Sequence, residues 1–435
     1  MTTQTANSKQ PWPAVAARLA ILALLVAAAG PVSAATAPGA AAVPGPRGLV
    51  GPDVPLSEAE KNRFAKSIRV EGLTSAAVQA ACERAAKEGA QAVLLQAGEY
   101  VFDVEVRVPA GLTVLGEGSR TLIRTRDKTT HLFSAAGDGV RFTRLKLQGA
   151  ATSPGTDNDT YGIAVAGKRN IRIDHCELLG FSYATNFADE AAAQVDHCAI
   201  HHNLREGLGY GVAIYSGAYV LVADNEFAQN RHSLASNGAL DWSSPQRLGK
   251  YVHKPGVRKT HWEFIHNRVG SNDLTTYELG AVDTHPGMDG TFVVEGNLFE
   301  RLRHGVGIRD GAGIIRGNLF RNLRTVTNFR PVMAISIAYG THNNVPVEGC
   351  MPHDIQVAEN TFEAAGGRAF TDAIVGESAE TPNVSKYRLG KAENITIEGT
   401  LIPETRKERG APAPILRLPE MGQDAPSRQT GDAGR

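Results

Sequence analysis

Short segments in which apolar and polar residues alternate recur along much of this 435-residue chain. Examples are residues 140–147 (Val-Arg-Phe-Thr-Arg-Leu-Lys-Leu) and residues 171–173 (Ile-Arg-Ile). Glycine, asparagine or aspartate bounds these segments, and this combination indicates half-buried β-strands separated by tight turns. Because the pattern extends from about residue 140 to residue 397, we expect an all-β protein built from many short strands.

A recurring phrase accompanies the strands: an asparagine followed, two residues later, by phenylalanine or valine. The asparagines of this phrase are Asn225, Asn267, Asn297, Asn318 and Asn360. Their spacings of 42, 30, 21 and 42 residues correspond to one or two units of about 21 residues with loops inserted. One such unit buries no core alone, but stacked units do. The predicted fold is therefore a right-handed parallel β-helix, with these asparagines as a structural ladder at a turn.

One helical pattern precedes the repeats. Residues 75–87 have the spacing of an amphipathic helix, with Ser75 as the expected N-cap and Gly89 beyond the end. The first strand-like segments follow directly. We expect this short helix to cap the open end of the solenoid, where the first coil would otherwise expose unpaired backbone groups.

The two ends of the chain differ from the repeats. Basic residues, an apolar run over residues 19–29 and small residues up to Ala34 give the pattern of a secretory signal peptide. The apolar run is too short to span a bilayer, so we expect a secreted or periplasmic protein with no membrane contact after signal removal. The expected segments are a signal peptide at 1–34, a linker at 35–70, a β-helix domain at 71–402 and a disordered tail at 403–435.

Charge and cysteine content limit the possible partners. Lys and Arg together number 45, as do Asp and Glu, and zero net charge argues against a nucleic-acid partner. The four cysteines lack zinc-ligand spacing. Cys176 and Cys198 lie in matching Asp-His-Cys phrases 22 residues apart, so they are expected to stack on adjacent coils, as a disulfide or as two reduced thiols. His175 and His197 are expected to stack with each other.

The helix, the Gly-bounded strands and the Asn phrases together resemble the pectate-lyase-like β-helix superfamily over about residues 72–399. That superfamily includes lyases, hydrolases, epimerases and phage adhesins, so the resemblance implies a fold and leaves the activity open. One local phrase, Asp283-Thr284-His285, resembles the Asp-Pro-His-Asp phrase of mannuronan C5-epimerases, with Thr284 in place of the proline. A coil bearing His-Gly follows in both, here at His304.

This resemblance implies removal of the C5 proton of a uronic acid. Such a reaction needs a base, an acid and a cation or metal that neutralises the neighbouring carboxylate. We expect His285 to be the base, with Asp283 orienting it or binding a cation. Arg231 is the expected carboxylate neutraliser and His232 an acid or base, about two coils away by repeat counting. These four residues are the predicted catalytic group.

Four further residues are predicted to bind the substrate. Tyr210, in a Gly-rich turn, could donate a proton to the leaving oxygen, and Trp242, in a long loop, could stack on a sugar ring. His304 and Arg309 lie in an Arg-rich stretch, residues 297–330, that could face an anion. Each type also has a structural use: tyrosine in packing, and arginine on solvent-facing coils.

No cofactor is predicted. Calcium would need several convergent carboxylates, and Asp283, Asp289 and Asp310 form no dense acidic cluster in the sequence. Calcium is therefore possible in principle but unsupported.

The leading hypothesis is an exported, monomeric enzyme that acts on an acidic polysaccharide as a β-elimination lyase or a C5-epimerase. The first alternative is a glycoside hydrolase on the same scaffold, which needs two suitably placed carboxylates. The second alternative is a non-catalytic β-helix that binds glycans at a surface.

Overall fold

The protein is described by a computed structural model. The described residues are 43–151, 153, 155–239, 254–270, 281–285, 287–302, 304–323, 333–337, 341–342, 345–346, 352–363, 372–376 and 393–398. All of them belong to one compact unit, Val43–Arg435. The predicted signal peptide and tail, and also Trp242 and Cys350, lie outside the described residues.

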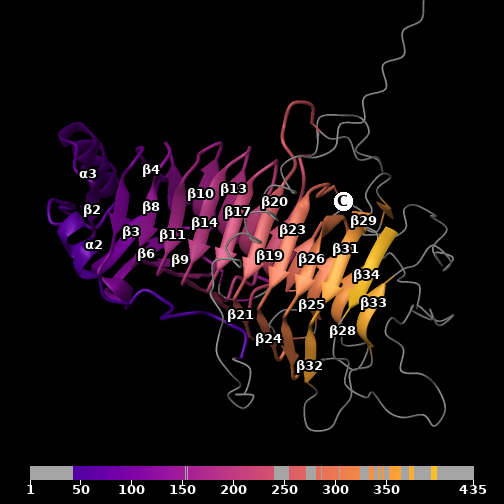
Figure 1. Cartoon of the computed structure of the whole chain (residues 1–435). Helices are drawn as coiled ribbons and strands as arrows, with labels where there is room; N and C mark the ends of the chain where they lie inside the picture. The colour runs from indigo at the N-terminus through magenta and orange to yellow at the C-terminus, as the bar shows by residue number, and fades with distance from the viewer. Residues whose placement is uncertain are drawn as a thin grey trace, which may run out of the picture. The chain divides into compact units, whose positions relative to one another are not determined.

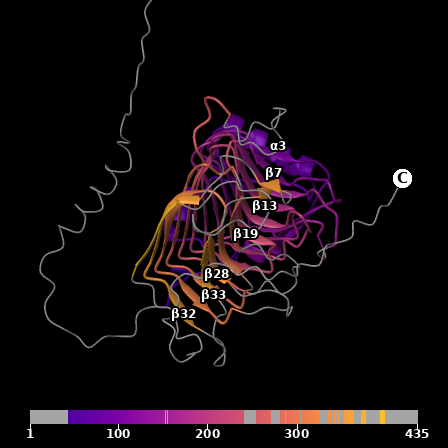
Figure 2. The same cartoon turned by 90° about the vertical axis from the view of Figure 1, so that its right-hand side faces the viewer.

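Three parallel sheets make up the described part of the chain, with twelve, ten and ten strands. The chain visits sheet 1, sheet 2 and sheet 3 in turn, and every third strand pairs with the previous strand of the same sheet in most of the stack (Figure 1). In Figure 2, turned by 90°, successive coils lie behind one another. This arrangement confirms the predicted all-β right-handed parallel β-helix.

Sheet 1 contains β1 (Ile68–Arg69), β2 (Ala92–Leu94), β5 (Thr113–Leu115), β8 (Arg141–Thr143), β11 (Ile171–Asp174), β14 (Ala192–Asp196), β17 (Tyr219–Ala223), β20 (His261–Ile265), β23 (Thr291–Glu295), β26 (Gly311–Arg316), β31 (Pro352–Ala358) and β34 (Glu393–Glu398). Sheet 2 contains β3 (Gly98–Phe102), β6 (Thr121–Thr125), β9 (Lys146–Gln148), β12 (Glu177–Leu179), β15 (Ala199–His201), β18 (Glu226–Ala228), β21 (Arg268–Val269), β24 (Leu298–Glu300), β27 (Leu319–Arg321) and β32 (Thr361–Glu363).

Sheet 3 contains β4 (Val106–Val108), β7 (Phe133–Ala135), β10 (Tyr161–Ala166), β13 (Tyr183–Ala188), β16 (Tyr210–Ile214), β19 (His232–Ser236), β22 (Val282–Thr284), β25 (His304–Ile308), β28 (Met333–Ile337) and β33 (Asp372–Gly376). A small antiparallel pair, β29 (Thr341–His342) and β30 (Val345–Pro346), lies outside the three sheets.

The Asn phrase forms a ladder at the turn between sheet 1 and sheet 2, as predicted. Each asparagine is buried, and the Nδ2 of each of the first four donates to the Oδ1 of the asparagine on the next coil. The four distances, from Asn225 through Asn267, Asn297 and Asn318 to Asn360, are 3.0, 3.2, 2.9 and 2.9 Å. Each Nδ2 also donates to a backbone carbonyl, for example Asn297 to Phe264 at 2.8 Å. The amides therefore satisfy buried polar groups at a turn that has no strand pairing.

Two other features of the phrase support the same turn. The residue before each asparagine is in the left-handed region, namely Asp224, His266, Gly296, Gly317 and Glu359. The phenylalanine of the phrase points into the core, where the rings stack between coils. Phe299 and Phe320 have ring centroids 4.9 Å apart, and Phe320 and Phe362 have theirs 5.2 Å apart.

Replacing Asn297 with Ala is expected to lower the thermal unfolding midpoint, because it leaves buried hydrogen-bonding groups of Asn267 and Asn318 without their partner. The cost should be about 3 kcal/mol. Asn62→Ala, at an exposed position, is the control and should change stability by less than about 0.5 kcal/mol. Equal midpoints for the two variants, measured by circular dichroism, would contradict a structural ladder.

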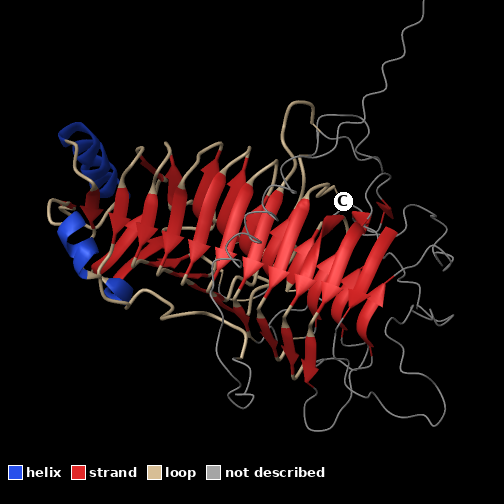
Figure 3. Ribbon diagram, in the orientation of Figure 1, coloured by secondary structure: helices blue, strands red, loops and turns tan. Residues whose placement is uncertain are grey.

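The described helices are α2 (Glu58–Arg63), α3 (Ser75–Glu88) and the 3-10 turn η1 (Gly118–Arg120). Helix α3 packs against the first four strands and caps the open end of the solenoid, as predicted (Figure 3). Gly89 ends it in the left-handed conformation, with φ of 69°. The N-cap is Thr74, whose hydroxyl accepts from the Ala77 amide at 3.2 Å, and not Ser75 as expected. No described helix has the length and hydropathy needed to cross a membrane.

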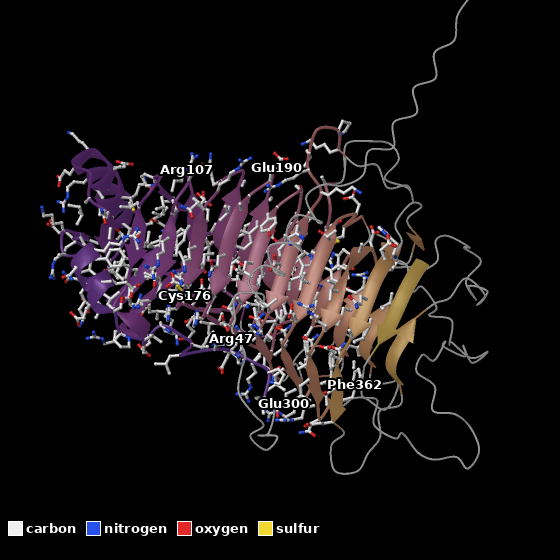
Figure 4. The ribbon with its side chains drawn as sticks, viewed as in Figure 1. Arg47, Arg107, Cys176, Glu190, Glu300 and Phe362 are labelled. Carbon is white, nitrogen blue, oxygen red and sulfur yellow. The ribbon has the colours of Figure 1, made fainter. Side chains whose placement is uncertain are left out.

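Residues 43–64, expected to be part of a linker, instead lie along the turns between sheets 1 and 2. We call this segment the N-terminal strap; Figure 4 shows its Arg47 beside the sheets. The Arg47 amide donates to Asp224 Oδ1 at 2.9 Å, and the Gly51 amide donates to the His197 carbonyl at 2.9 Å. The Pro- and Gly-rich composition is misleading because the segment is held by hydrogen bonds to several coils. Its Phe64 also packs against Ala92 and Leu115.

Glu60 of α2 fastens the strap to the third coil. Its carboxylate lies 2.7 Å from the Arg141 guanidinium and 3.1 Å from that of Arg144. Burial alone would raise the pKa of Glu60, but the hydrogen bond from Arg141 and the charge of Arg144 lower it from 4.5 to about 2. Since the folded pKa is depressed, this stabilisation is present above the unfolded pKa and is lost as the pH falls from about 4.5 through about 2.

We therefore expect Glu60→Gln to lower the free energy of unfolding at pH 7 by at most about 3 kcal/mol. The difference from the parent should shrink steadily as the pH falls below the unfolded pKa of the carboxyl group. Glu58→Gln is the control, because Glu58 belongs to the same helix but pairs with Lys61 at an exposed position. Urea denaturation at several pH values measures both variants, and a pH-independent Glu60→Gln effect would contradict the ion-pair interpretation.

The matching Asp-His-Cys phrases stack on adjacent coils, as predicted. The rings of His175 and His197 have centroids 5.1 Å apart and an angle of 10° between their planes. Cys176, labelled in Figure 4, and Cys198 are buried free thiols, so the reduced alternative applies in this structure. Burial, together with the neighbouring Cys176 thiol, raises the pKa of Cys198 well above its ordinary value.

Candidate active site

Sheet 3 brings the four predicted catalytic residues together. Strand β19 begins at His232 and pairs directly with β22, which carries Asp283. The predicted distance of two coils is therefore wrong, since the two strands lie on neighbouring coils. The count failed because more than two units of about 21 residues separate His232 from Asp283 along the chain, yet β19 and β22 pair directly.

Arg231 and His232 follow a second pair of stacked amides. Asn203 Nδ2 donates to Asn230 Oδ1 at 2.8 Å, and Asn230 Nδ2 donates to the Ile200 carbonyl at 2.8 Å. Both asparagines are buried at the turn between sheet 2 and sheet 3. Asn230 is therefore structural, and it fixes the backbone from which the two candidate side chains project.

Asp283 is the centre of the site and is 1% exposed. Its carboxylate lies 3.0 Å from His285 Nε2 and 3.7 Å from His232 Nε2. The Arg309 guanidinium reaches both carboxylate oxygens, with Nε donating to Oδ1 at 3.1 Å and Nη2 donating to Oδ2. Asp283 thus forms an ion pair with Arg309 and contacts His285.

Opposing effects set the protonation of Asp283. Burial by itself raises the pKa of the carboxyl group, but the charge of Arg309 and the hydrogen bond from His285 lower it. The resulting pKa of Asp283 lies far below the usual range of a carboxyl group. Asp283 is consequently ionised at any physiological pH. An ionised carboxylate only accepts hydrogen bonds, so it cannot serve as a general acid here.

His285 is kept neutral and in one tautomer. Burial is the largest cause of the downward shift of its pKa, and Arg309 adds to it, while Asp283 opposes it. Because ionised Asp283 can only accept, the imidazole proton is assigned to Nε2, which leaves the lone pair on Nδ1. The ring is 18% exposed by its side chain. A neutral, oriented and partly exposed imidazole is the form that a general base requires.

Tyr210 and Arg231 form a pair beside the histidines. Arg231 Nη1 donates to the Tyr210 hydroxyl at 2.9 Å, and the guanidinium carbon lies 5.3 Å from the ring centroid. The ring centroids of Tyr210 and His285 are 5.9 Å apart. Burial raises the pKa of Tyr210, although Arg231 opposes the shift, so the phenol keeps its proton at neutral pH. The site therefore contains a neutral base and a protonated hydroxyl close to each other.

The charges of these side chains favour an anion. Arg231 and Arg309 each carry a positive charge, while Asp283 supplies one negative charge that Arg309 already contacts. In a largely buried environment such charges are weakly screened. The arrangement can hold a carboxylate-bearing ligand next to a base and a hydroxyl donor.

Other predicted residues are less central. His304 begins β25 and lies at the same edge of sheet 3, two positions before Val306, which pairs with Val282. Asp310 is a turn residue: Oδ2 accepts from the Gly287 amide at 2.7 Å. Trp242 lies outside the described residues.

Three groups of the site are close enough to share a metal ion. The ligand atoms of His232, Asp283 and His285 lie within 4.8 Å of one another. Two imidazoles and one carboxylate would suit zinc better than calcium, which needs more oxygen ligands. The guanidinium of Arg309 already contacts both Asp283 oxygens, so these residues do not fit a calcium ion.

Sequence reasoning missed Thr284 and two further tyrosines. The Thr284 hydroxyl accepts from the Arg309 amide at 2.7 Å and so fixes the arginine that pairs with Asp283. Tyr161 and Tyr183 stand in register with Tyr210 on neighbouring strands of sheet 3. Each begins its strand next to a small residue, at intervals of 22 and 27 residues. This repeated Tyr-small phrase was the signal available in the sequence.

Several solved structures are similar to this chain at low sequence identity. No curated protein matches the chain. Among solved structures, the catalytic domain of a GH87 alpha-1,3-glucanase in complex with nigerose is 14% identical, with 82% of this chain and 68% of that chain covered and a TM-score of 0.46. An alginate lyase from Paenibacillus sp. str. FPU-7 is 14% identical, with 76% and 99% covered and a TM-score of 0.43. The A-module of the Azotobacter vinelandii mannuronan C-5 epimerase AlgE4 is 13% identical, with 79% and 98% covered and a TM-score of 0.36.

Identities this low do not carry an activity from one β-helix to another. The family described as right handed beta helix region matches residues 134–351, half of the chain. The three stacked parallel sheets agree with that match. This protein therefore belongs to the right handed beta helix region family.

Proposed function

We propose that this protein is an enzyme that removes the C5 proton of a uronic acid unit in an acidic polysaccharide, as a β-elimination lyase or a C5-epimerase. One observation carries the proposal: the Asp283–His285 pair lies beside a protonated Tyr210 and two guanidinium groups. This is the set of groups that C5 proton abstraction requires, a base, an acid and a charge that stabilises the carboxylate.

The reaction follows from the protonation states. Nδ1 of neutral His285 accepts the C5 proton, and the electron pair moves into the neighbouring carboxylate, where Arg231 or Arg309 stabilises the added charge. In a lyase the pair then returns to form the C4–C5 double bond while the C4–O4 bond breaks, and Tyr210 protonates the departing oxygen. In an epimerase Tyr210 would instead protonate C5 from the opposite face.

A hydrolase is less well supported by the described residues of the site. Hydrolysis of a glycosidic bond usually needs two carboxyl groups, one of them a proton donor. Asp283 is held ionised by Arg309 and His285, and Asp310 accepts from backbone amides at its turn. Neither carboxyl group is arranged as a general acid.

We expect the reaction to be independent of added metal. Arg309 contacts both oxygens of Asp283, and so it neutralises the carboxylate that a cation would need. Dialysis against EDTA should leave the turnover number unchanged, and added calcium or zinc should not raise it. A loss of activity on dialysis that zinc restores would show that His232, Asp283 and His285 form a metal centre instead.

A panel of alginates, pectates and glycosaminoglycans tests the proposal. Ultraviolet absorbance from an unsaturated product identifies a lyase, and solvent deuterium incorporated at C5 without cleavage identifies an epimerase. New reducing ends without ultraviolet absorbance would identify a hydrolase and contradict the proposal. If a correctly folded protein gives no signal in any of the three assays, the result would favour a non-catalytic glycan-binding protein.

A further inference from the structure

A second cluster lies on sheet 3, on the N-terminal side of the candidate active site. Tyr161 and Tyr183 begin β10 and β13, and their ring centroids are 4.7 Å apart. Tyr183 and Tyr210 have centroids 5.4 Å apart. The aromatic rings therefore form a continuous row from β10 to the active site. Tyr161 and Tyr183 are both partly exposed, unlike the tyrosine of the active site.

Arg205 supplies a positive charge at this cluster. Its guanidinium lies 3.0 Å from Asp157 and 3.6 Å from Asp159. The arginine side chain is only 20% exposed, whereas the two aspartates are 87% and 68% exposed. The Nε atom of Arg205 is buried and has no hydrogen-bond partner in the described part of the chain. Arg205 is thus a well-placed cation whose present partners are solvated acids, and ion pairs of that kind are weak.

The charge of Arg205 acts on both neighbouring rings. It opposes the rise in the pKa of Tyr161 and of Tyr183 that burial causes. The ion pair with Asp159, two residues before Tyr161, places the guanidinium next to the start of β10. An arginine beside aromatic rings can bind a carboxylate while the rings contact an apolar sugar face.

The strand register gives the distance to the active site. Asn186 of β13 pairs with Ala213, Ala213 pairs with Ala235, and Ala235 pairs with Asp283. Three strand spacings correspond to about 14 Å. Asn186 Oδ1 is buried without a hydrogen-bond partner among the described residues. The strand that carries Tyr183 is thus separated from Asp283 by a span of a few sugar units.

We propose that Tyr161, Tyr183 and Arg205 form a second carboxylate-binding subsite, which holds another uronate unit of the same polysaccharide. The inference rests on the proposed function and extends it: the preferred substrate is a chain long enough to reach both clusters. The incoming carboxylate replaces Asp157 and Asp159 on Arg205. The exposed aspartates therefore compete with the substrate for the arginine.

Isothermal titration with size-defined oligogalacturonates and oligomannuronates, from disaccharide to octasaccharide, tests the subsite. A His285→Ala background prevents consumption of the ligand. Arg205→Gln is expected to weaken binding of the long oligomers about tenfold or more, with the disaccharides unaffected. Arg268→Gln is the matched control, because Arg268 lies on sheet 2 and pairs with Glu226 and Glu300. Neutral cello-oligosaccharides should show no dependence on Arg205.

A second variant tests the subsite through an expected gain of affinity. The double substitution Asp157→Asn with Asp159→Asn removes the competing acids, so long oligouronates should bind more tightly. Equal affinities for the parent, Arg205→Gln and the double variant at every length would overturn the subsite and leave the proposed function standing. If the parent binds no oligouronate of any length, both the subsite and the proposed function are wrong.

Discussion

Replacing His285 with Ala is expected to reduce the turnover number by about 10²- to 10⁴-fold, the usual contribution of a positioned general base. The physical reason is that the neutral imidazole, oriented by Asp283 at 3.0 Å, is the group able to accept the C5 proton. The Michaelis constant should change little, because the guanidinium groups that attract the substrate remain. Steady-state kinetics on the substrate found in the glycan panel measures both constants.

His261→Ala is the matched control for this experiment. His261 is similarly exposed but lies on sheet 1, where its ring contacts Thr291 and Glu263. Its loss should leave turnover unchanged. The His285→Ala protein should also keep its circular dichroism spectrum, since the removed ring is outside the main core. Full turnover in a folded His285→Ala variant would eliminate this residue as the base.

Replacing Asp283 with Asn is expected to damage both activity and stability. The substitution removes a buried negative charge that Arg309 contacts, and breaking a buried ion pair costs about 3 kcal/mol or more. Activity should fall by at least about 10²-fold, because the imidazole loses the acceptor that fixes its tautomer.

The pH profile distinguishes this orienting role from a general loss of stability. Asp283 raises the pKa of His285, against the downward effects of burial and Arg309. Removing its charge should lower that pKa further, so the acid limb of residual activity should move to lower pH. An acid limb that moves to higher pH would contradict the assigned arrangement.

Asp196→Asn provides a closely matched control. Asp196 is also buried, is held by Arg172 with bonds of 2.9 and 2.8 Å, and contacts His197 at 2.9 Å. This cluster lies on sheet 1, away from the candidate active site. We expect a comparable loss of stability with no effect on turnover. Similar losses of activity in both variants would mean that Asp283 acts only through the fold.

Much of the fold could be predicted from local patterns. The Asn phrase repeats because each coil must turn at the same place and satisfy the same buried backbone groups, so its spacing reports the stacking directly. The pair Cys176 and Cys198, and the stacked histidines beside them, were found by the same count. The N-terminal strap could not be found in this way, because backbone hydrogen bonds to distant coils leave no periodic trace in composition.

The candidate site was predicted in part. The Asp283-Thr284-His285 phrase drew attention because it interrupts the repeat, and the structure brings it next to His232. The distance between them was misjudged, since loops can be inserted at the turns of a β-helix without changing which strands pair. The contact of Arg309 with Asp283, and that of Arg231 with Tyr210, depend on side-chain directions that spacing does not specify.

The sequence by itself therefore determined the stacked-coil architecture, since a short repeat can bury its apolar face only against its neighbours. It also marked the positions where the repeat is broken. Only the tertiary structure decided how those positions combine: that Asp283 is ionised by contact with Arg309, that His285 is neutral, and that a row of tyrosine rings extends from Tyr210 to Tyr161. These properties arise from burial and from charges brought together across coils, and residues distant along the chain acquire them only when the coils stack.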